Sequence, residues 1–218
     1  MTPAPPYTEP ARDVPIKWLN YNLRYAAAIA LHELGKPSIA KVNGDAVGAG
    51  MNLALGCDLI VAGESGGGNL TLATGLQLAA DGDMGLIRGL YALCPYIAGE
   101  WPQSRFPSSI ENNGILLDLH NNTAKVGYGI EAFDAKDPLA WPSFATEDDV
   151  AGLPPTMISV NECDPLRDEG IEFYRLLLEA GVAARCRQVM GTMHGIEVFA
   201  LSCPDVSHET AASIVRWA

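Results

Sequence analysis

The chain of 218 residues is long enough for one domain with a sizeable core. Its composition, 48% apolar and 18% charged, is that of a globular protein and excludes disordered and fibrous classes. A formal net charge of -12 argues against nucleic acid and anionic membrane surfaces as partners.

The N-terminal quarter begins with a Pro-rich, polar leader at residues 1–13, which lacks the basic and apolar regions of a secretory signal. Beyond it, apolar side chains at three- and four-residue spacing predict a helix, and short apolar runs beside glycine-rich turns predict strands. In chain order we expect a helix at 13–34, a strand at 38–42, a glycine-rich turn at 43–50, a short helix at 51–56 and a buried strand at 58–62.

The rest of the chain alternates helical and strand patterns in the same way. We expect helices at 69–80, 123–133, 166–180 and 209–217. Strands are expected at 157–160 and 183–190, and residues 86–97 should form another buried strand with its exit loop. Strands that alternate with helices indicate an α/β fold with a mostly parallel sheet and flanking helices.

The sequence predicts neither a membrane span nor a metal site. The longest apolar-looking stretch, residues 16–34, carries four ionisable side chains, which disfavours a span. Five cysteines are widely spread and have no metal-ligand spacing, which is typical of free thiols in a reducing cytoplasm. We therefore expect a cytoplasmic protein that needs no metal or organic cofactor.

A candidate nucleophile lies in residues 63–67, whose sequence GESGG fits the pattern G-x-S-x-G. A buried strand is expected before this turn and a helix after it, and such a sharp turn lifts the hydroxyl of Ser65 clear of the sheet. The N–H of Gly66, at the start of that helix, can donate to a developing oxyanion. The same pentapeptide also occurs as a plain glycine-rich turn without chemistry, so the pattern needs a base and an acid to support it.

A serine nucleophile needs a base, and the chain has four histidines. His194 follows the strand expected at 183–190, where a loop can deliver an imidazole over the edge of the sheet. The other three histidines fit surface positions or helix caps better: His32, His120 and His208.

Asp164 comes just after an expected strand and is the carboxylate that we expect to orient His194. Asp168 and Glu162 are rivals, although an acid at the start of a helix is more often a cap or a dipole partner. Ser65, Asp164 and His194 each follow a strand end on the same side of a parallel sheet, which is where open α/β folds bind ligands.

Long stretches around these residues carry a family resemblance: GESGGGNLTLAT (63–74), DPLAWPSFATEDDVAGLPP (137–155), NECDPLRDEG (161–170) and MHG (193–195). From residue 63 onward the chain resembles the hormone-sensitive-lipase-like branch of α/β-hydrolases, of the brefeldin A esterase type. The order serine, acid, histidine is the order of that fold. The resemblance implies that Ser65 is the nucleophile, Asp164 the acid and His194 the base in the hydrolysis of a small neutral ester.

A second resemblance covers residues 14–64. The stretch KPSIAKVNGDAVGAGMNLALGCDLIVAGE (36–64) resembles a segment of the enoyl-CoA hydratase/isomerase, or crotonase, family. By that resemblance the turn at Ala46 donates a backbone N–H to an oxyanion hole, which makes Ala46 a second candidate donor beside Gly66. The HGGG-type loop that normally supplies further donors in the hydrolase family is missing before Ser65.

We therefore expect one truncated α/β-hydrolase-like sandwich, with a loose leader at 1–13, a crotonase-like helix-strand-helix-strand segment at 14–64 and a catalytic portion at 65–218. The leading function is ester hydrolysis through an acyl-enzyme, slowed by the missing loop. A catalytically inactive hybrid stays open for the same reason, and a crotonase-like acyl-CoA hydratase or isomerase stays open because of residues 14–64. An open sheet edge in such a hybrid also predicts a homo-oligomer.

Overall fold

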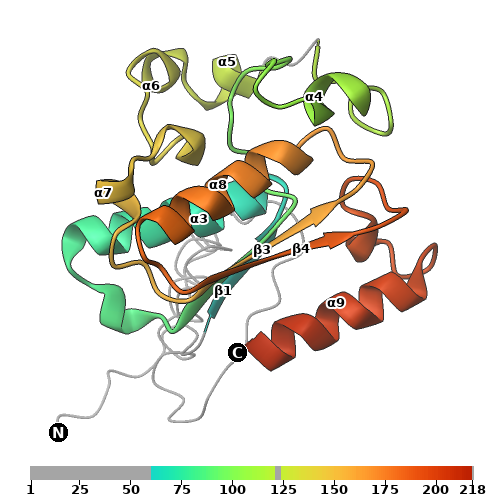
Figure 1. Cartoon of the computed structure of the whole chain (residues 1–218). Coiled ribbons are helices and arrows are strands. Elements are labelled where there is room, and N and C mark those ends of the chain that lie inside the picture. Colours follow the sequence, from blue (N-terminus) through green and yellow to red (C-terminus); the bar gives the residue numbers. More distant parts are fainter. Residues whose placement is uncertain (1–59, 121–123, 218) are drawn as a thin grey trace, which may run out of the picture.

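The structure is a computed structural model that describes residues 60–120 and 124–217 of the chain (Figure 1). The leader and the elements expected over residues 13–56 lie outside these described residues, and so does Ala46. The fold and the site are therefore built from the part that begins at the buried strand before Ser65.

Four strands form one parallel sheet in the order β1-β2-β3-β4. They are β1 (Ile60–Glu64), β2 (Gly89–Leu93), β3 (Thr156–Asn161) and β4 (Ala184–Val189). All residues of β2 and β3 are buried, as expected for central strands of a parallel sheet whose two faces are covered. The buried strand with its exit loop expected at 86–97 is confirmed, since β2 ends at Leu93 and the chain then leaves the sheet.

Helices cover both faces of this sheet. In Figure 1, α3 (Gly66–Asp81) and α8 (Arg167–Glu179) lie on one face, and α9 (Pro204–Trp217) lies on the other. The first face holds the main apolar core, whose buried members include Leu72, Leu76, Leu90, Ala92, Ile158, Val160, Phe173 and Leu177. Alternate residues of the strands, such as Tyr91 and Met157, face α9. The structure confirms the predicted α/β class with a parallel sheet and flanking helices.

A long irregular segment, residues 94–155, connects β2 to β3 and is called the β2–β3 connection below. It contains the short helices α4 (Ser108–Glu111), α5 (Ala124–Tyr128), α6 (Ile130–Asp134), η2 (Pro142–Phe144) and α7 (Glu147–Val150). The single helix expected at 123–133 is wrong, because Gly129 has a φ of 119° and separates α5 from α6. In Figure 1, α4, α5 and α6 lie on the side of the molecule opposite α9.

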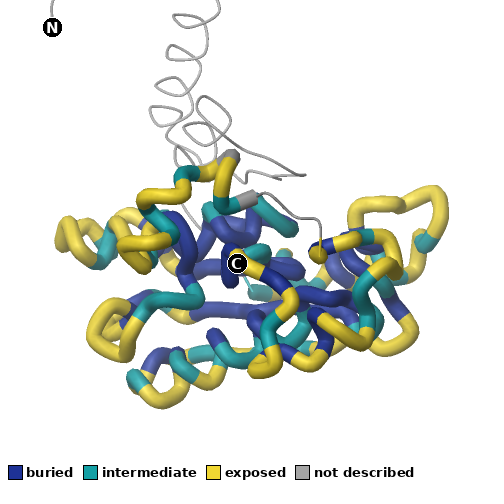
Figure 2. Tube along the Cα trace, turned by 90° about the horizontal axis from the view of Figure 1, so that it is seen from above, coloured by how far each residue is buried: buried dark blue, intermediate teal, exposed yellow. Residues whose placement is uncertain are grey.

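Burial follows this layered arrangement, with β2 and β3 buried at the centre, the edge strand β4 partly exposed and exposed turns around the rim (Figure 2). The β2–β3 connection has an apolar cluster of its own, in which Tyr96, Trp101 and Trp141 pack in tilted and edge-on contacts with ring centroids 4.5 to 6.4 Å apart. Within residues 60–120 and 124–217, no helix combines the length and the apolar character needed to cross a membrane. Two short 3-10 helices, η1 (Met84–Leu86) and η3 (Ile196–Val198), complete the elements of this part.

Candidate active site

The turn between β1 and α3 holds Ser65 in an unusual backbone conformation. Ser65 has a φ of 57°, and its N–H donates to the carbonyl oxygen of Leu93 on the neighbouring strand at 2.9 Å. A positive φ is uncommon for a residue with a side chain and marks a turn held by its surroundings. The glycine at position 63 is required for space, because a Cβ there would lie 2.2 Å from the carbonyl oxygen of Gly67. The local sequence thus folds into the strand-turn-helix that the pentapeptide predicts.

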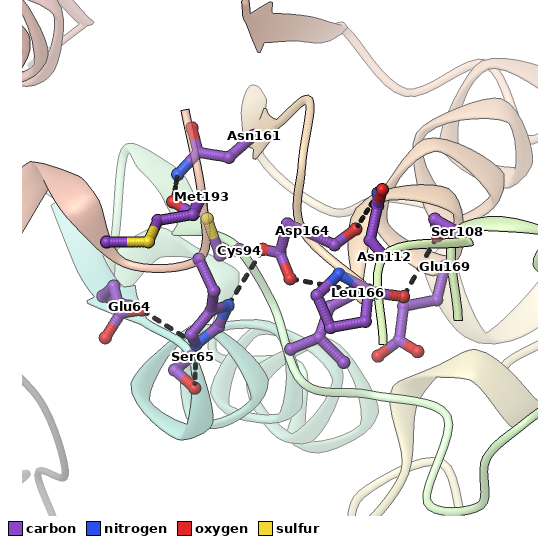
Figure 3. Close-up of polar contacts among 12 residues, drawn as sticks. Glu64, Ser65, Cys94, Ser108, Asn112, Asn161, Asp164, Leu166, Glu169 and Met193 are labelled. Carbon is purple, nitrogen blue, oxygen red and sulfur yellow. Dashed lines mark hydrogen bonds and ion pairs between the residues drawn. The ribbon is translucent and has the colours of Figure 1, made fainter. Parts of the chain in front are cut away.

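The structure brings Ser65, His194 and Asp164 into one hydrogen-bonded line (Figure 3). Nε2 of His194 lies 2.9 Å from Oγ of Ser65, and Nδ1 of the same ring lies 2.9 Å from Oδ2 of Asp164. Oδ1 of Asp164 accepts a hydrogen bond from the N–H of Leu166 at 2.9 Å. Asp164 is fully buried and His194 is 6% exposed, so the Asp164–His194 pair is shielded from water. A carboxylate at Nδ1 favours the tautomer that leaves Nε2 free to accept the serine proton.

Two loops at the carboxyl ends of β3 and β4 bring the acid and the base together. The N–H of Cys163, next to Asp164, donates to the carbonyl oxygen of Thr192 at 2.8 Å, which joins the two loops directly. Gly195 follows His194 with a φ of 63°, and a Cβ there would lie 2.7 Å from Oε1 of Glu64. The glycine therefore permits the turn that carries the imidazole to the end of β1.

The electrostatic surroundings of His194 are strongly acidic. Burial by itself lowers the pKa of the imidazole, but the hydrogen bond and charge of Asp164, together with the charges of Glu64 and Glu197, outweigh it. The pKa of His194 is consequently raised above the usual 6.5. The same carboxylates therefore stabilise the imidazolium that forms when the ring takes a proton.

Sequence reasoning passed over Glu64, Cys94 and Glu197, which all lie close to the imidazole. Oε1 of Glu64 is 3.3 Å from Nε2 of His194, and its place beside Ser65 in the pentapeptide was the available signal. The Sγ of Cys94 approaches Oε1 of Glu197 at 3.9 Å. No local motif points to Cys94 or Glu197, because they reach the site only through the fold.

Cys94, Asp164 and His194 also present possible metal ligands, with atoms within 4.8 Å of one another. Burial and the charges of nearby carboxylates raise the pKa of the Cys94 thiol well above 9.0, so the sulfur stays protonated and is a weak ligand. Asp164 and His194 already pair with each other at 2.9 Å. The donor set fits a hydrogen-bonded acid and base better than a metal centre.

Gly66, the expected oxyanion donor, is the first residue of α3 and directly follows Ser65. The first N–H groups of a helix have no acceptor within it, so they point toward any anion at its start. The second expected donor, Ala46, lies outside the described residues, and its place relative to Ser65 stays a prediction.

The rival residues are occupied elsewhere in the structure. Asp168 accepts a hydrogen bond from the N–H of Ser108, and Glu162 accepts one from the N–H of Gly191. His120 is exposed. The prediction that His208 starts a helix is wrong, since α9 begins at Pro204 and His208 lies in its second turn. His32 falls outside the described residues.

Comparison with known proteins gives the family. A family model described as alpha/beta hydrolase fold matches residues 25–198. Esterase LipI of Mycobacterium tuberculosis is 33% identical over 165 residues, which cover 74% of this chain and 50% of LipI. A 2,3-dehydroadipyl-CoA hydratase of Escherichia coli is 48% identical over 61 residues, or 28% of this chain and 24% of the hydratase. The chain spans about half the length of the curated esterases that it matches.

Solved structures agree with this assignment. A structure of esterase Est22 is 61% identical, covers 90% of this chain and 53% of its own, and gives a TM-score of 0.75. Brefeldin A esterase, a bacterial homologue of human hormone-sensitive lipase, is 42% identical and covers 71% of this chain and 45% of its own, with a TM-score of 0.67. The chain therefore belongs to the alpha/beta hydrolase fold family, in its hormone-sensitive-lipase-like branch.

Proposed function

We propose that the protein is a serine carboxylesterase in which Ser65, His194 and Asp164 act as nucleophile, base and orienting acid. The observation that carries the proposal is the pair of 2.9 Å contacts that links the serine hydroxyl through the imidazole to a fully buried carboxylate. Est22, LipI and brefeldin A esterase, which are named as esterases, support the same chemistry.

The reaction follows from the order of these contacts. Oγ of Ser65 attacks the ester carbonyl while Nε2 of His194 takes its proton, and the resulting imidazolium is stabilised by Asp164 at Nδ1. The imidazolium then gives the proton to the leaving alcohol, which leaves an acyl-serine. Water, deprotonated by the same nitrogen, attacks the acyl group, and the proton returns to Oγ as the acid product departs.

Small neutral esters are the substrate class that we propose. The formal charge of -12 and the carboxylates of Glu64, Asp164 and Glu197 around the imidazole disfavour an anionic substrate. A neutral acyl ester carries no charge that these groups repel. The proposed chemistry uses side chains and backbone N–H groups alone.

The oxyanion hole is the weakest part of the proposed machinery. Gly66 supplies one N–H at the start of α3, and we propose the turn at Ala46 as the source of a second donor in place of the missing HGGG loop. Loss of a single oxyanion donor costs about 10²–10³ in rate. We therefore expect slow turnover from this chain compared with a relative that has the HGGG loop.

The proposal is tested by labelling and turnover together. Wild-type protein should hydrolyse a short-chain p-nitrophenyl ester and gain the mass of one phosphonate on the peptide that contains Ser65. S65A should lose both signals while keeping its circular dichroism spectrum, since only one hydroxyl is removed. Hydrolysis by S65A at the wild-type rate, or phosphonate labelling at another residue, would disprove this assignment of the nucleophile.

We also propose that residues 14–64 are a crotonase-like segment joined to a hydrolase-like portion at 65–218. The short match to the hydratase, 48% identical over 61 residues, supports a crotonase-like part of the chain. The hydrolase family model matches from residue 25 and so overlaps residues 14–64. A crotonase-like activity would hydrate crotonyl-CoA and survive treatment with a serine-directed phosphonate. We expect no such hydration, because the acid and base residues of that chemistry have no matching motif downstream.

A further inference from the structure

A buried polar chain lies behind the imidazole and takes no direct part in the proposed reaction. Its centre is Asn161, the last residue of β3, which is fully buried. Nδ2 of Asn161 donates to the carbonyl oxygen of Met193 at 2.7 Å (Figure 3) and to Oε2 of Glu197 at 2.9 Å. One amide group therefore holds the loop of His194 on both sides of that residue.

The other end of this chain is Cys94. Its thiol lies 3.9 Å from Oε1 of Glu197, and its N–H donates to the carbonyl oxygen of Ser159 on β3 at 2.7 Å. Cys94 has a φ of 42°, uncommon for a residue with a side chain, and is fully buried. Since burial keeps the thiol protonated, Cys94 can act as a weak donor to the carboxylate. Glu197 is thus tied to the ends of both β2 and β3.

We propose that Asn161 and Glu197 form a clamp that positions the imidazole of His194 for the proposed esterase reaction. The inference rests on that proposed function, and it makes both residues positioning residues rather than catalytic ones. Met193 precedes His194 directly and Glu197 follows it by three residues, so the two bonds fix the loop at both ends. The imidazole itself contacts Ser65, Asp164 and Glu64, and the clamp adds a hold on the backbone that carries it.

Loss of the clamp should lower turnover for two reasons, the displacement of the imidazole and the loss of hydrogen bonds by buried polar groups. A displacement of about 1 Å at a catalytic group can lower turnover about 10²-fold. Removal of one partner also leaves a buried polar group without its hydrogen bond, which shifts the local backbone toward other arrangements. The clamp acts on the position of the base, so kcat should fall while KM for a small ester changes little.

A matched pair of variants at Glu197 separates the hydrogen bond from the bulk of the side chain. E197Q keeps an oxygen that can accept from Asn161, whereas E197M has a similar length and no such acceptor. At a pH where His194 is neutral, we expect E197Q to keep kcat within about threefold of wild type. We expect E197M and N161A to lose about 10- to 100-fold in kcat. Y91F is the control, because it removes a part-buried hydrogen bond to Ser213 of α9 and leaves the bonds of Asn161 to Met193 and Glu197 in place.

The second readout needs no turnover. In wild-type protein the Nδ1 proton of His194, held between ring and carboxylate, should give a far-downfield proton NMR signal. That signal should persist in E197Q and Y91F and be lost or broadened in E197M and N161A. If the wild-type protein shows the signal but hydrolyses no ester, the proposed function is refuted. The clamp is then tested by the NMR signal alone, and loss of that signal in E197M and N161A supports it. Wild-type kcat and an unchanged signal in both E197M and N161A, or equal losses in E197Q and E197M, would overturn the clamp.

Discussion

Two regions of the molecule achieve order in different ways. The strand-end loops at residues 63–67, 161–166 and 191–197 carry the three candidate catalytic side chains and are held by the Asn161–Glu197 clamp and by backbone hydrogen bonds. Examples are the N–H of Ser65 on the carbonyl oxygen of Leu93, and the direct bond between the loops of Asp164 and His194.

The β2–β3 connection is held in part by buried side chains of the helices beneath it, such as Asn69 of α3 and Glu169 of α8. Glu169 is almost fully buried and accepts hydrogen bonds from the N–H groups of Ile97 and Ala98 and from the indole of Trp101, at 2.7 to 3.2 Å. One carboxylate thereby fixes the first turns of the segment after β2. We therefore expect a change in the strand-end loops to affect turnover more than the free energy of unfolding. A change beneath the β2–β3 connection should affect the free energy of unfolding first.

The largest effect is expected from D164N, which tests the chemical side of this comparison. An amide at this position donates to Nδ1 of His194 and so favours the tautomer whose Nε2 carries the proton and cannot accept one from Ser65. Turnover of a p-nitrophenyl ester should fall about 10⁴-fold, with little change in the shape of the site. Steady-state kinetics and urea unfolding of the same preparations measure both quantities.

A matched control for D164N is D168N. Asp168 is also an acid near the start of α8, and its carboxylate binds the N–H of Ser108 instead of a histidine. D168N should keep kcat within a few-fold of wild type. If D164N and D168N lost kcat to a similar extent, the loss would follow from removing any carboxylate near the start of α8, and Asp164 would have no specific role.

The next effect concerns Glu169 and stability. Burial raises the pKa of Glu169 from 4.5 to about 8, against the lowering effect of its three N–H donors. Between these two values the folded protein binds a proton that the unfolded chain has released, so stability falls as pH rises. The slope is about 1.4 kcal/mol per pH unit. E169Q does not titrate, so the difference in unfolding free energy between wild type and E169Q should change by this slope from pH 6 to pH 7 and then level off as the pH passes about 8.

The control for this measurement is E172Q. Glu172 lies one turn further along α8, is half-exposed and pairs with Arg105 at 3.2 Å, so its removal should leave the pH slope as in wild type. Urea unfolding followed by tryptophan fluorescence at several pH values gives the slopes directly. A wild-type slope in E169Q would mean that Glu169 is ionised across the whole range.

The same contrast explains how far the sequence predicts the structure. The strand-end site could be predicted because a local pentapeptide, strand ends and chain order specify where Ser65, Asp164 and His194 meet. The β2–β3 connection could not, since its order depends on contacts of long sequence separation, such as Glu169 with Ile97. The single helix predicted at 123–133 failed at Gly129, where a positive φ outweighs the helical pattern on either side. Glu197 escaped prediction for a related reason, because its partner Asn161 is 36 residues away.

The smallest effect is a shift in the pH dependence of turnover on replacement of Glu64. The neutral imidazole of His194 is the base, so activity should fall as pH drops through its pKa, which is raised above 6.5. The carboxylate of Glu64 lies 3.3 Å from Nε2 and stabilises the protonated ring. E64Q removes this charge, which should lower the pKa of His194 and move the acid limb of the kcat/KM profile by about one unit to lower pH.

E100Q removes a carboxylate from the β2–β3 connection, where Glu100 pairs with Lys125, and should leave the limb in place. A limb that stays at its wild-type position in E64Q would show that Asp164 and Glu197 set the pKa of the base without help from the residue beside the nucleophile.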